Sequence, residues 1–256
     1  MRTIRMVLEY QGTRYNGWQT QPHGNTVQDV LESRLGQILD HEVRVHGAGR
    51  TDRGVHARGQ VASFQTGSAL PVDRLFHGLN ALLPHDIAAV RWAVAEEGFH
   101  ARHSARSREY CYQVWRGRVC SPFQFPFVYH LHRREVDLDA MNEAASRVVG
   151  AHDFTSFCAA ESAEQDMVRE VHLSRWAAEG ELWRYHVRAR SFVHHMVRNL
   201  VGTFVEVGLG RREPGDLDTI LTVRDRRAAG PTAQAQGLFL EHVGYEEHDP
   251  REGGES

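Results

Sequence analysis

The chain contains no lysine, so all 30 of its basic residues are arginine. Arginine is the better bidentate ligand for phosphate, but genomic base composition explains the absence equally well, and it excludes no function by itself. Cysteine is also scarce, with Cys111, Cys120 and Cys158 far apart in the sequence. An odd number of cysteines without a CxxC pair excludes a disulfide framework and a CxxC zinc site, and is typical of a reducing cytosol.

Long apolar runs are missing as well. No stretch approaches the roughly 20 apolar residues that a membrane-spanning helix needs. The first residues, Met1-Arg-Thr-Ile-Arg5, are not followed by the apolar segment of a signal peptide. We therefore expect a cytoplasmic protein that makes no contact with a membrane.

The net charge of −3 is unfavourable for binding nucleic acid, but it is distributed unevenly. Residues 241–256 contain six acidic residues and one arginine, a local charge of −5. Residues 99–119 contain five arginines and one glutamate, and residues 184–198 contain four arginines and no acid, a local charge of +4 in each case. A localised basic face is the usual footprint of nucleic-acid binding, although a solvated charged surface gives the same pattern.

Hydrophobic periodicity predicts the same order of elements in both halves of the chain. In the first half we expect strands at 3–10, 42–46, 60–65 and 87–94, and helices at 27–39 and 72–83. Thr26 and Asp29 form an approximate capping box at the start of the first helix. In the second half we expect strands at 109–115, 168–176, 182–189 and 237–243, and helices at 139–149, 192–207 and 216–221.

Both halves therefore read as β-α-β-β-α-β, the ferredoxin-like order. Sheets of this kind bind RNA on their open face. We expect an α+β fold of two ferredoxin-like halves, residues 1–95 and 96–245, whose antiparallel sheets combine around a central RNA-binding cleft. The acidic tail, residues 246–256, is expected to be disordered.

The segment Gly47–Ala57 reads GAGRTDRGVHA, and its three glycines indicate tight turns or close approach of backbone. It lacks the lysine and the spacing of a phosphate-binding Walker A loop. Its one acid, Asp52, stands between Arg50 and Arg53. A carboxylate beside guanidinium groups stays ionised and holds a fixed direction, which suits a nucleophile. The alternative is an aspartate that bonds the backbone of its own turn.

Two tyrosines stand two residues apart in the strand expected at 109–115. Tyr110 and Tyr112 point to the same face of a sheet because side chains alternate along a strand. One of them could stack on a base while Arg106 and Arg108 hold phosphate. Core packing is the alternative for at least one of the pair.

The segment Phe192–Asn199 reads FVHHMVRN and opens the most strongly periodic helix. Arg198 lies on the flank of its apolar stripe, where it could reach a carboxylate or a phosphate, or extend to solvent. His194 and His195 are adjacent, and no acid or cysteine stands at a metal-ligand spacing from them. We therefore expect no metal site.

The segment 47–57 resembles the signature loop of the TruA family of tRNA pseudouridine synthases. Further segments resemble blocks of the same family in the same order, at 11–19, 26–28, 99–102, 150–157, 192–199 and 237–240. The sequence departs from the family pattern at Arg53, Glu109 and Cys111, beside the functional positions. These departures could alter contacts of the loop with RNA and leave the chemistry untouched.

The resemblance implies isomerisation of uridine to pseudouridine at positions 38, 39 and 40 of the anticodon stem-loop of tRNA. It implies a homodimer that holds one tRNA across both subunits and needs no cofactor and no metal. It places the catalytic aspartate at Asp52 and the base-stacking tyrosine at Tyr110. It places two further substrate-binding residues at Arg50 and Arg198. We expect Thr51, Arg53 and His56 of the same loop to bind substrate as well.

Three alternatives remain at this point. A non-catalytic RNA-binding module would need no single aspartate in an arginine-flanked glycine loop. A metal-dependent nuclease or hydrolase is suggested by the 17 histidines and would lose activity with EDTA. A pseudouridine synthase that acts on other RNA positions would share every feature described so far.

Overall fold

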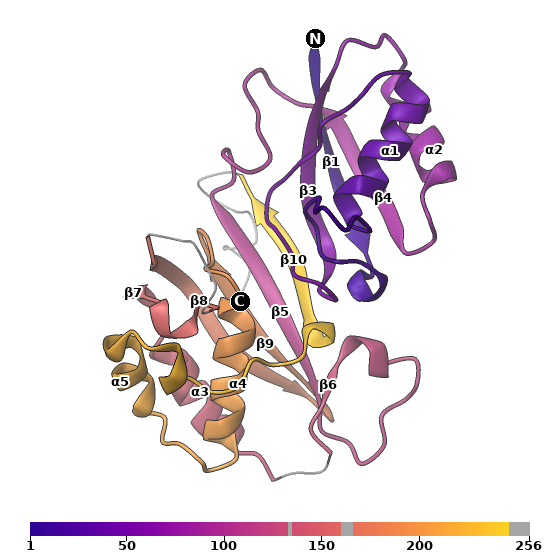
Figure 1. Cartoon of the computed structure of the whole chain (residues 1–256). Helices are drawn as coiled ribbons and strands as arrows, with labels where there is room; N and C mark the ends of the chain where they lie inside the picture. Colours follow the sequence, from indigo (N-terminus) through magenta and orange to yellow (C-terminus); the bar gives the residue numbers. More distant parts are fainter. Residues whose placement is uncertain (133–134, 160–165, 246–256) are drawn as a thin grey trace, which may run out of the picture. The chain divides into compact units, whose positions relative to one another are not determined.

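The computed structural model describes residues 1–132, 135–159 and 166–245 (Figure 1). The expected disorder of the tail at 246–256 concerns residues outside this part of the chain. The chain divides into two compact units. The first comprises Met1–Arg108 and the chain from Phe239 onward, and the second comprises Glu109–Leu238. No helix of the described residues is long and apolar enough to cross a membrane.

The first unit contains the β-α-β-β-α-β order expected for its half of the chain. Its elements are β1 (Arg2–Tyr10), α1 (Val27–Leu39), β2 (His46–Gly47), β3 (His56–Thr66), α2 (Val72–Leu82) and β4 (Ile87–Val94), with the 3-10 turn η1 (Gly12–Arg14) after β1. The antiparallel strands β4, β1 and β3 lie in that order, and β2 pairs with β3. The last strand, β10 (Leu238–Gly244), adds to β3 in parallel through Phe239 and Leu240.

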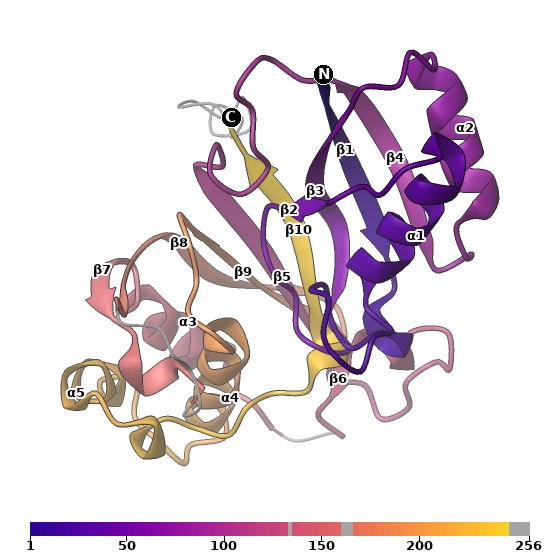
Figure 2. The ribbon, with the colours of Figure 1, turned by 45° about the horizontal axis from the view of Figure 1, so that its top comes forward.

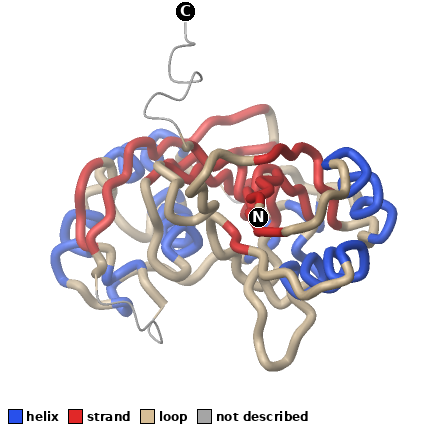
Figure 3. Tube along the Cα trace, turned by 90° about the horizontal axis from the view of Figure 1, so that it is seen from above, coloured by secondary structure: helices blue, strands red, loops and turns tan. Residues whose placement is uncertain are grey.

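Alternation along β1 builds the core of this unit. Ile4, Met6 and Leu8 are fully buried on one face, as the period of two along a strand requires. Leu31 and Leu35 of α1 are also fully buried. In Figure 3 the helices of each unit lie on one side of that unit's strands. The other face of this sheet in the first unit is covered in part by the turn at 99–105, whose Ala101 N–H donates to Ser63 Oγ of β3 at 3.0 Å.

The second unit is also a mixture of mainly antiparallel strands and helices. Its elements are β5 (Ser107–Trp115), η2 (Phe125–Phe127), β6 (Tyr129–His130), α3 (Leu138–Ser146), β7 (Gly150–Asp153), η3 (Thr155–Phe157), β8 (Val168–Glu179), β9 (Leu182–Ala189), α4 (Met196–Gly208), α5 (Asp216–Val223), η4 (Arg226–Ala228) and η5 (Ala235–Gly237). The strands run in the order β5, β9, β8, β7, with β6 beside β5. Trp176, Tyr185 and Phe204 pack ring to ring between the hairpin β8–β9 and α4. The expected α+β class is confirmed.

Three local expectations were wrong. The strand expected at 42–46 shrinks to β2, because Val45 is bound by side chains of α1: its N–H donates to Glu32 Oε1 at 2.9 Å, and its carbonyl accepts from Gln28 Nε2 at 3.1 Å. The helix expected from Phe192 begins only at Met196. His195, just before it, has φ of 63°, a left-handed conformation that keeps the helical backbone from extending back to Phe192. The helix expected to continue to 149 ends at Ser146.

Candidate active site

The loop at residues 48–55 connects β2 to β3 (Figure 2). Side chains from the sheet hold its first residues. We call it the Asp52 loop. The Gln60 amide bonds Gly49 twice, donating from Nε2 to its carbonyl at 2.7 Å and accepting its N–H at Oε1 at 3.3 Å. The Ala48 carbonyl accepts from Arg108 at 2.8 Å through Nη2 and at 3.2 Å through Nε. These contacts fix the direction in which the chain leaves the sheet.

Asp52 opens a tight turn. The Val55 N–H donates to the Asp52 carbonyl at 3.1 Å, and Gly54 at the third position has φ of 80°. A turn with this bond and a positive φ at its third residue favours glycine there. The sequence therefore places Asp52 at the first position of the turn, where the backbone is fixed at its carbonyl.

The segment after β1 forms the floor beneath this turn. The Trp18 N–H donates to the Thr51 carbonyl at 3.0 Å. Gly17, with φ of 89°, lies so close that a Cβ there would meet the Thr51 carbonyl oxygen at 2.6 Å and Asp52 C at 3.1 Å. Gly12 lies closer still against the Val55 backbone. The backbone of the Asp52 loop therefore rests directly on the backbone of residues 12–18.

Thr51 points into the core rather than to solvent. It is 5% exposed, and its Oγ1 lies 2.8 Å from the hydroxyl of Tyr10, which is also buried. Burial raises the pKa of Tyr10 to about 12, against a smaller lowering by its hydrogen bonds with Thr51 and Gln60. Tyr10 therefore stays protonated and anchors the residue before Asp52.

His56 is buried at the end of the loop, with 1% of its surface exposed. Its Nδ1 accepts the Gly12 N–H at 3.0 Å, and its ring stacks on Phe239 at 4.7 Å between centroids. This placement ties η1 to β3 and β10. Direct contact with a substrate would require the ring to be uncovered.

The charged side chains of the Asp52 loop lie at or near its surface. Asp52 is partly exposed, whereas Arg50 and Arg53 on either side are exposed. In the residues that the structure describes, neither of these two arginines forms an ion pair. Uncompensated guanidinium groups around a half-buried carboxylate suit the binding of a polyanion whose reacting atom approaches that carboxylate.

Tyr110 and Arg198 lie in the second unit. Tyr110, on β5, is 8% exposed and meets Phe192 edge to face at 5.0 Å between ring centroids. Arg198, on α4, donates from Nε to the Ala233 carbonyl at 2.8 Å, and its own carbonyl accepts the Ala233 N–H at 3.1 Å. Its side chain is therefore directed along the segment that follows η4.

Tyr112 is the more deeply buried member of the tyrosine pair. It is fully buried, and its hydroxyl donates to the Gln234 carbonyl at 2.7 Å. Burial raises its pKa well above the ordinary value of a tyrosine, and the nearby charge of Arg198 opposes this in part. Tyr112 is thus a structural residue, as the sequence indicated for one of the two.

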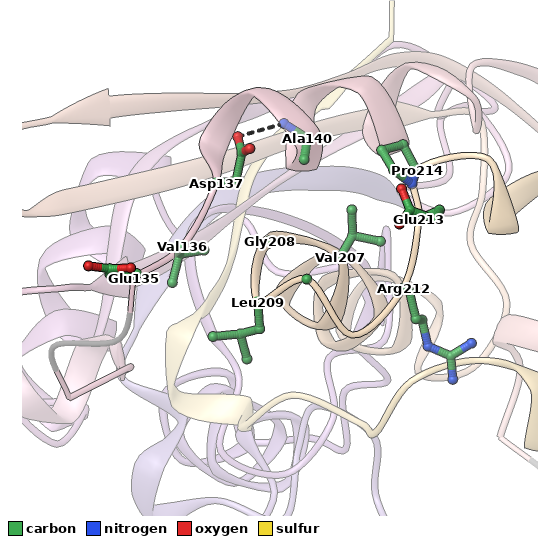
Figure 4. A pocket seen from close by; sticks show the side chains of 11 residues that line it. Glu135, Val136, Asp137, Ala140, Val207, Gly208, Leu209, Arg212, Glu213 and Pro214 are labelled. Atoms are coloured by element: carbon green, nitrogen blue, oxygen red, sulfur yellow. Dashed lines mark hydrogen bonds between the residues drawn. The ribbon is translucent and has the colours of Figure 1, made fainter.

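A pocket in the second unit contains none of these residues. It lies between the start of α3 and the end of α4, and is drawn in Figure 4. Its polar groups serve the fold: Asp137 caps α3 by accepting the Ala140 N–H at 3.0 Å, and Arg212 donates to Glu206 at 2.6 Å.

Comparison with known proteins gives a consistent result. A family model described as tRNA pseudouridine synthase matches residues 6–104 and 144–246. The chain is 43% identical to tRNA pseudouridine synthase A of Myxococcus xanthus, over 98% of this chain and 94% of that protein. It is 43% identical to the protein of the same name from Moorella thermoacetica, over 96% of this chain and 100% of that protein.

Among solved structures, a chain from the crystal structure of a Cbf5–Nop10–Gar1 complex aligns with a TM-score of 0.39 and 11% identity, covering 95% of this chain and 50% of that chain. The sequence matches decide the assignment, because they extend over nearly the whole of both proteins. The chain belongs to the TruA family of tRNA pseudouridine synthases, enzymes that isomerise uridine in tRNA.

Proposed function

We propose that this enzyme converts uridine to pseudouridine at positions 38, 39 and 40 of the anticodon stem-loop, with Asp52 as its catalytic nucleophile. One observation supports this role above all others. Gln60 fixes the Asp52 loop at Gly49, and the backbone of Gly17 lies directly against that of Asp52. The partly exposed Asp52 side chain stands between two exposed arginines. Preorganised placement of this kind is what a reacting group requires.

The reaction sets the demands on these residues. The C1′–N1 bond breaks, the uracil turns, a C1′–C5 bond forms, C5 loses its proton and N1 gains one. A stacked uracil is out of reach, so the nucleotide is flipped out of the helix. Asp52 then attacks C1′ and displaces N1 of the uracil, or adds to C6, and in either case its bond to the substrate breaks again before the product leaves. Attack of a carboxylate on a sugar carbon has a parallel in retaining glycosidases. The reaction is an isomerisation, so no redox partner is consumed.

The other residues take supporting roles in this proposal. Arg50 fills the space that the flipped base leaves, or pairs with the RNA backbone, and Arg53 holds phosphate beside it. Thr51 and His56 act from the buried side by fixing the loop through Tyr10 and Gly12. Tyr110 stacks on the detached base, and Arg198 binds a phosphate or the carboxylate.

We further propose that two ferredoxin-like halves form the RNA-binding cleft and that two subunits hold one tRNA. The element order of the first unit and the basic segments at 99–119 and 184–198 support this. Light scattering coupled to size exclusion measures the mass of the subunit assembly directly. A single subunit at all protein concentrations would contradict the dimer.

The test of the proposed reaction is release of tritium from tRNA labelled at C5 of uridine, in the presence of EDTA. We expect the wild-type protein to release tritium and Asp52→Asn to release none, while both bind tRNA with similar affinity. Chemical mapping of pseudouridine in the product then reports which positions react. Turnover by Asp52→Asn, or product only outside positions 38 to 40, would contradict the proposal.

A further inference from the structure

Three histidine rings of the first unit lie against one another, with their planes tilted, beside the Asp52 loop. His46 of β2 lies 4.7 Å from His100 between ring centroids, and His100 lies 4.3 Å from His103. We call these three residues the histidine stack. His46 and His103 are exposed and His100 is half-buried. None of them belongs to the residues to which the proposed function assigns a role.

The turn that carries two of these histidines is firmly held. His100 Nδ1 accepts the N–H of Arg102 at 3.1 Å, which leaves Nε2 of the ring directed away from the turn. The Tyr245 hydroxyl donates to the Ala101 carbonyl at 2.7 Å. Arg108 Nη2 donates to the Arg102 carbonyl at 2.9 Å. The histidine stack is therefore a preformed surface rather than a chance meeting of side chains on a loose loop.

Arg108 also joins this turn to the Asp52 loop. The same Nη2 that bonds the Arg102 carbonyl bonds the Ala48 carbonyl, the first residue of the loop. Along the chain, His46 stands two residues before Ala48. The histidine stack and the loop thus form one continuous part of the surface of the first unit.

The surroundings of the histidine stack are basic. Arg102 and Arg106 are exposed, and neither forms an ion pair with any residue that the structure describes. Burial lowers the pKa of His100 first, and the neighbouring His46, His103 and Arg102 lower it further. The charged groups that act on this ring from its own turn and from β2 are therefore all basic. Further contacts of the turn come from Ser63, which is uncharged, from the Tyr245 hydroxyl and from two more arginines: Arg108 bonds the Arg102 carbonyl, and the Arg5 guanidinium lies over the Phe99 ring.

We propose that the histidine stack and Arg102 form a binding site for the phosphodiester backbone of tRNA, and that this site takes up protons when RNA binds. The inference rests on the proposed function, since it concerns the same substrate. It adds a contact site away from the reacting uridine.

The physical reason is the mutual repulsion within the histidine stack. Imidazoles this close cannot all be protonated without a compensating anion, so protonation of one disfavours protonation of the next. A phosphate placed against the rings supplies this anion, and it opposes the lowering that His46 and His103 impose on the pKa of His100. Binding then takes up protons, and by linkage the affinity for tRNA rises as the pH falls through the range in which histidine titrates.

The test uses the full-length protein carrying Asp52→Asn, so that binding is measured without turnover. The double variant His46→Gln/His103→Gln removes the two exposed rings and keeps His100, which holds the turn. The matched control is His77→Gln/His85→Gln, two exposed histidines of the same unit outside the histidine stack. Binding of a tRNA transcript is measured at about pH 6 and about pH 8.5, on either side of the histidine pKa, over a range of salt.

We expect the double variant at the lower pH to bind about tenfold more weakly, with a slope of log K against log salt smaller by about one. At the higher pH the double variant binds tRNA as tightly as the protein that carries Asp52→Asn alone. The control variant keeps the pH dependence of that protein. Arg102→Gln weakens binding at both pH values, because its charge does not titrate. Equal affinity of the double variant and the parent at the lower pH would overturn the inference, as would an equal loss at both.

Tritium release by the protein with Asp52 intact separates the two proposals. The double variant in this background is expected to raise KM at the lower pH and to keep kcat at saturating tRNA. If the wild-type protein releases no tritium at all, the proposed function fails. If it releases tritium but the histidine variants bind normally at both pH values, only the histidine site fails.

Discussion

At the scale of single residues, the position of Asp52 depends on glycines that lie opposite it. The sequence identified the Asp52 loop from its own glycines and charges, but not Gly12 and Gly17, which support it. The need for glycine at those positions arises from the backbone of Thr51, Asp52 and Val55 lying against them. That is a tertiary contact, and periodicity along the chain contains no sign of it.

Gly17→Ala is therefore expected to displace the Asp52 loop. Its Cβ would meet the Thr51 carbonyl, and its φ of 89° is strained for alanine, so we expect a loss of about 2 to 3 kcal/mol in the free energy of unfolding. The rate of tritium release at saturating tRNA should fall by at least about tenfold, because small displacements of a reacting group are costly. Gly24→Ala is the control: its φ is 61°, its Cβ would meet nothing within 4 Å, and it should cost only about 1 kcal/mol and leave turnover intact.

Tyr10 gives a prediction about alkaline pH. Burial raises its pKa from 10 in the unfolded chain to about 12 in the folded protein, so the folded state holds the proton more tightly. Its contribution to stability is fully present below pH 10 and is lost as the pH rises through 12. Urea unfolding of wild type and Tyr10→Phe should therefore differ by about 1 kcal/mol near neutral pH, and the difference should shrink above pH 10. A difference that grows there would contradict the assignment.

At the scale of elements, helix starts were predictable where the signal is local. The capping box is present: Asp29 N–H donates to Thr26 Oγ1, and the Thr26 N–H donates to Asp29 Oδ2, each at 3.2 Å. The start of α4 was not predictable, because the apolar stripe continues through Val193 while His195 adopts a left-handed backbone. That conformation accompanies a contact with a distant segment, in which the His194 carbonyl accepts the Ala159 N–H at 2.9 Å.

Two glycines inside helices should respond to alanine with opposite signs. Gly36 of α1 has only the His41 carbonyl near its Cβ position, at 3.5 Å, so Gly36→Ala should stabilise the protein by up to about 1 kcal/mol through helix propensity. Gly202 of α4 lies directly against the Pro231 carbonyl, so Gly202→Ala should destabilise it by about 2 kcal/mol or more, as overpacking does. Denaturant unfolding measures both. Stabilisation by Gly202→Ala as well would show that the segment after η4 yields without cost, and destabilisation by Gly36→Ala would contradict the first prediction.

At the scale of the whole molecule, the α+β class and the element order were predictable, because both follow from hydrophobic periods along the chain. The return of the last strand to the first unit was not. The strand itself was expected at 237–243, but its parallel pairing of Phe239 and Leu240 with His56 and Ala57 joins the two ends of the chain. Which strands become neighbours depends on faces and edges that only the assembled sheet presents.

This return makes residues 239–245 part of the structure that holds Asp52. Phe239 stacks on His56, Glu241 bonds Arg58, and the Tyr245 hydroxyl reaches Ala101. A chain ended after Leu238 loses all three contacts, so we expect it to unfold at a markedly lower temperature and to release no tritium from tRNA. A chain ended after Tyr245 keeps them, and should match the full-length protein in melting temperature and in kcat. If both truncations behaved alike, β10 would not be what fixes β3 beneath the Asp52 loop.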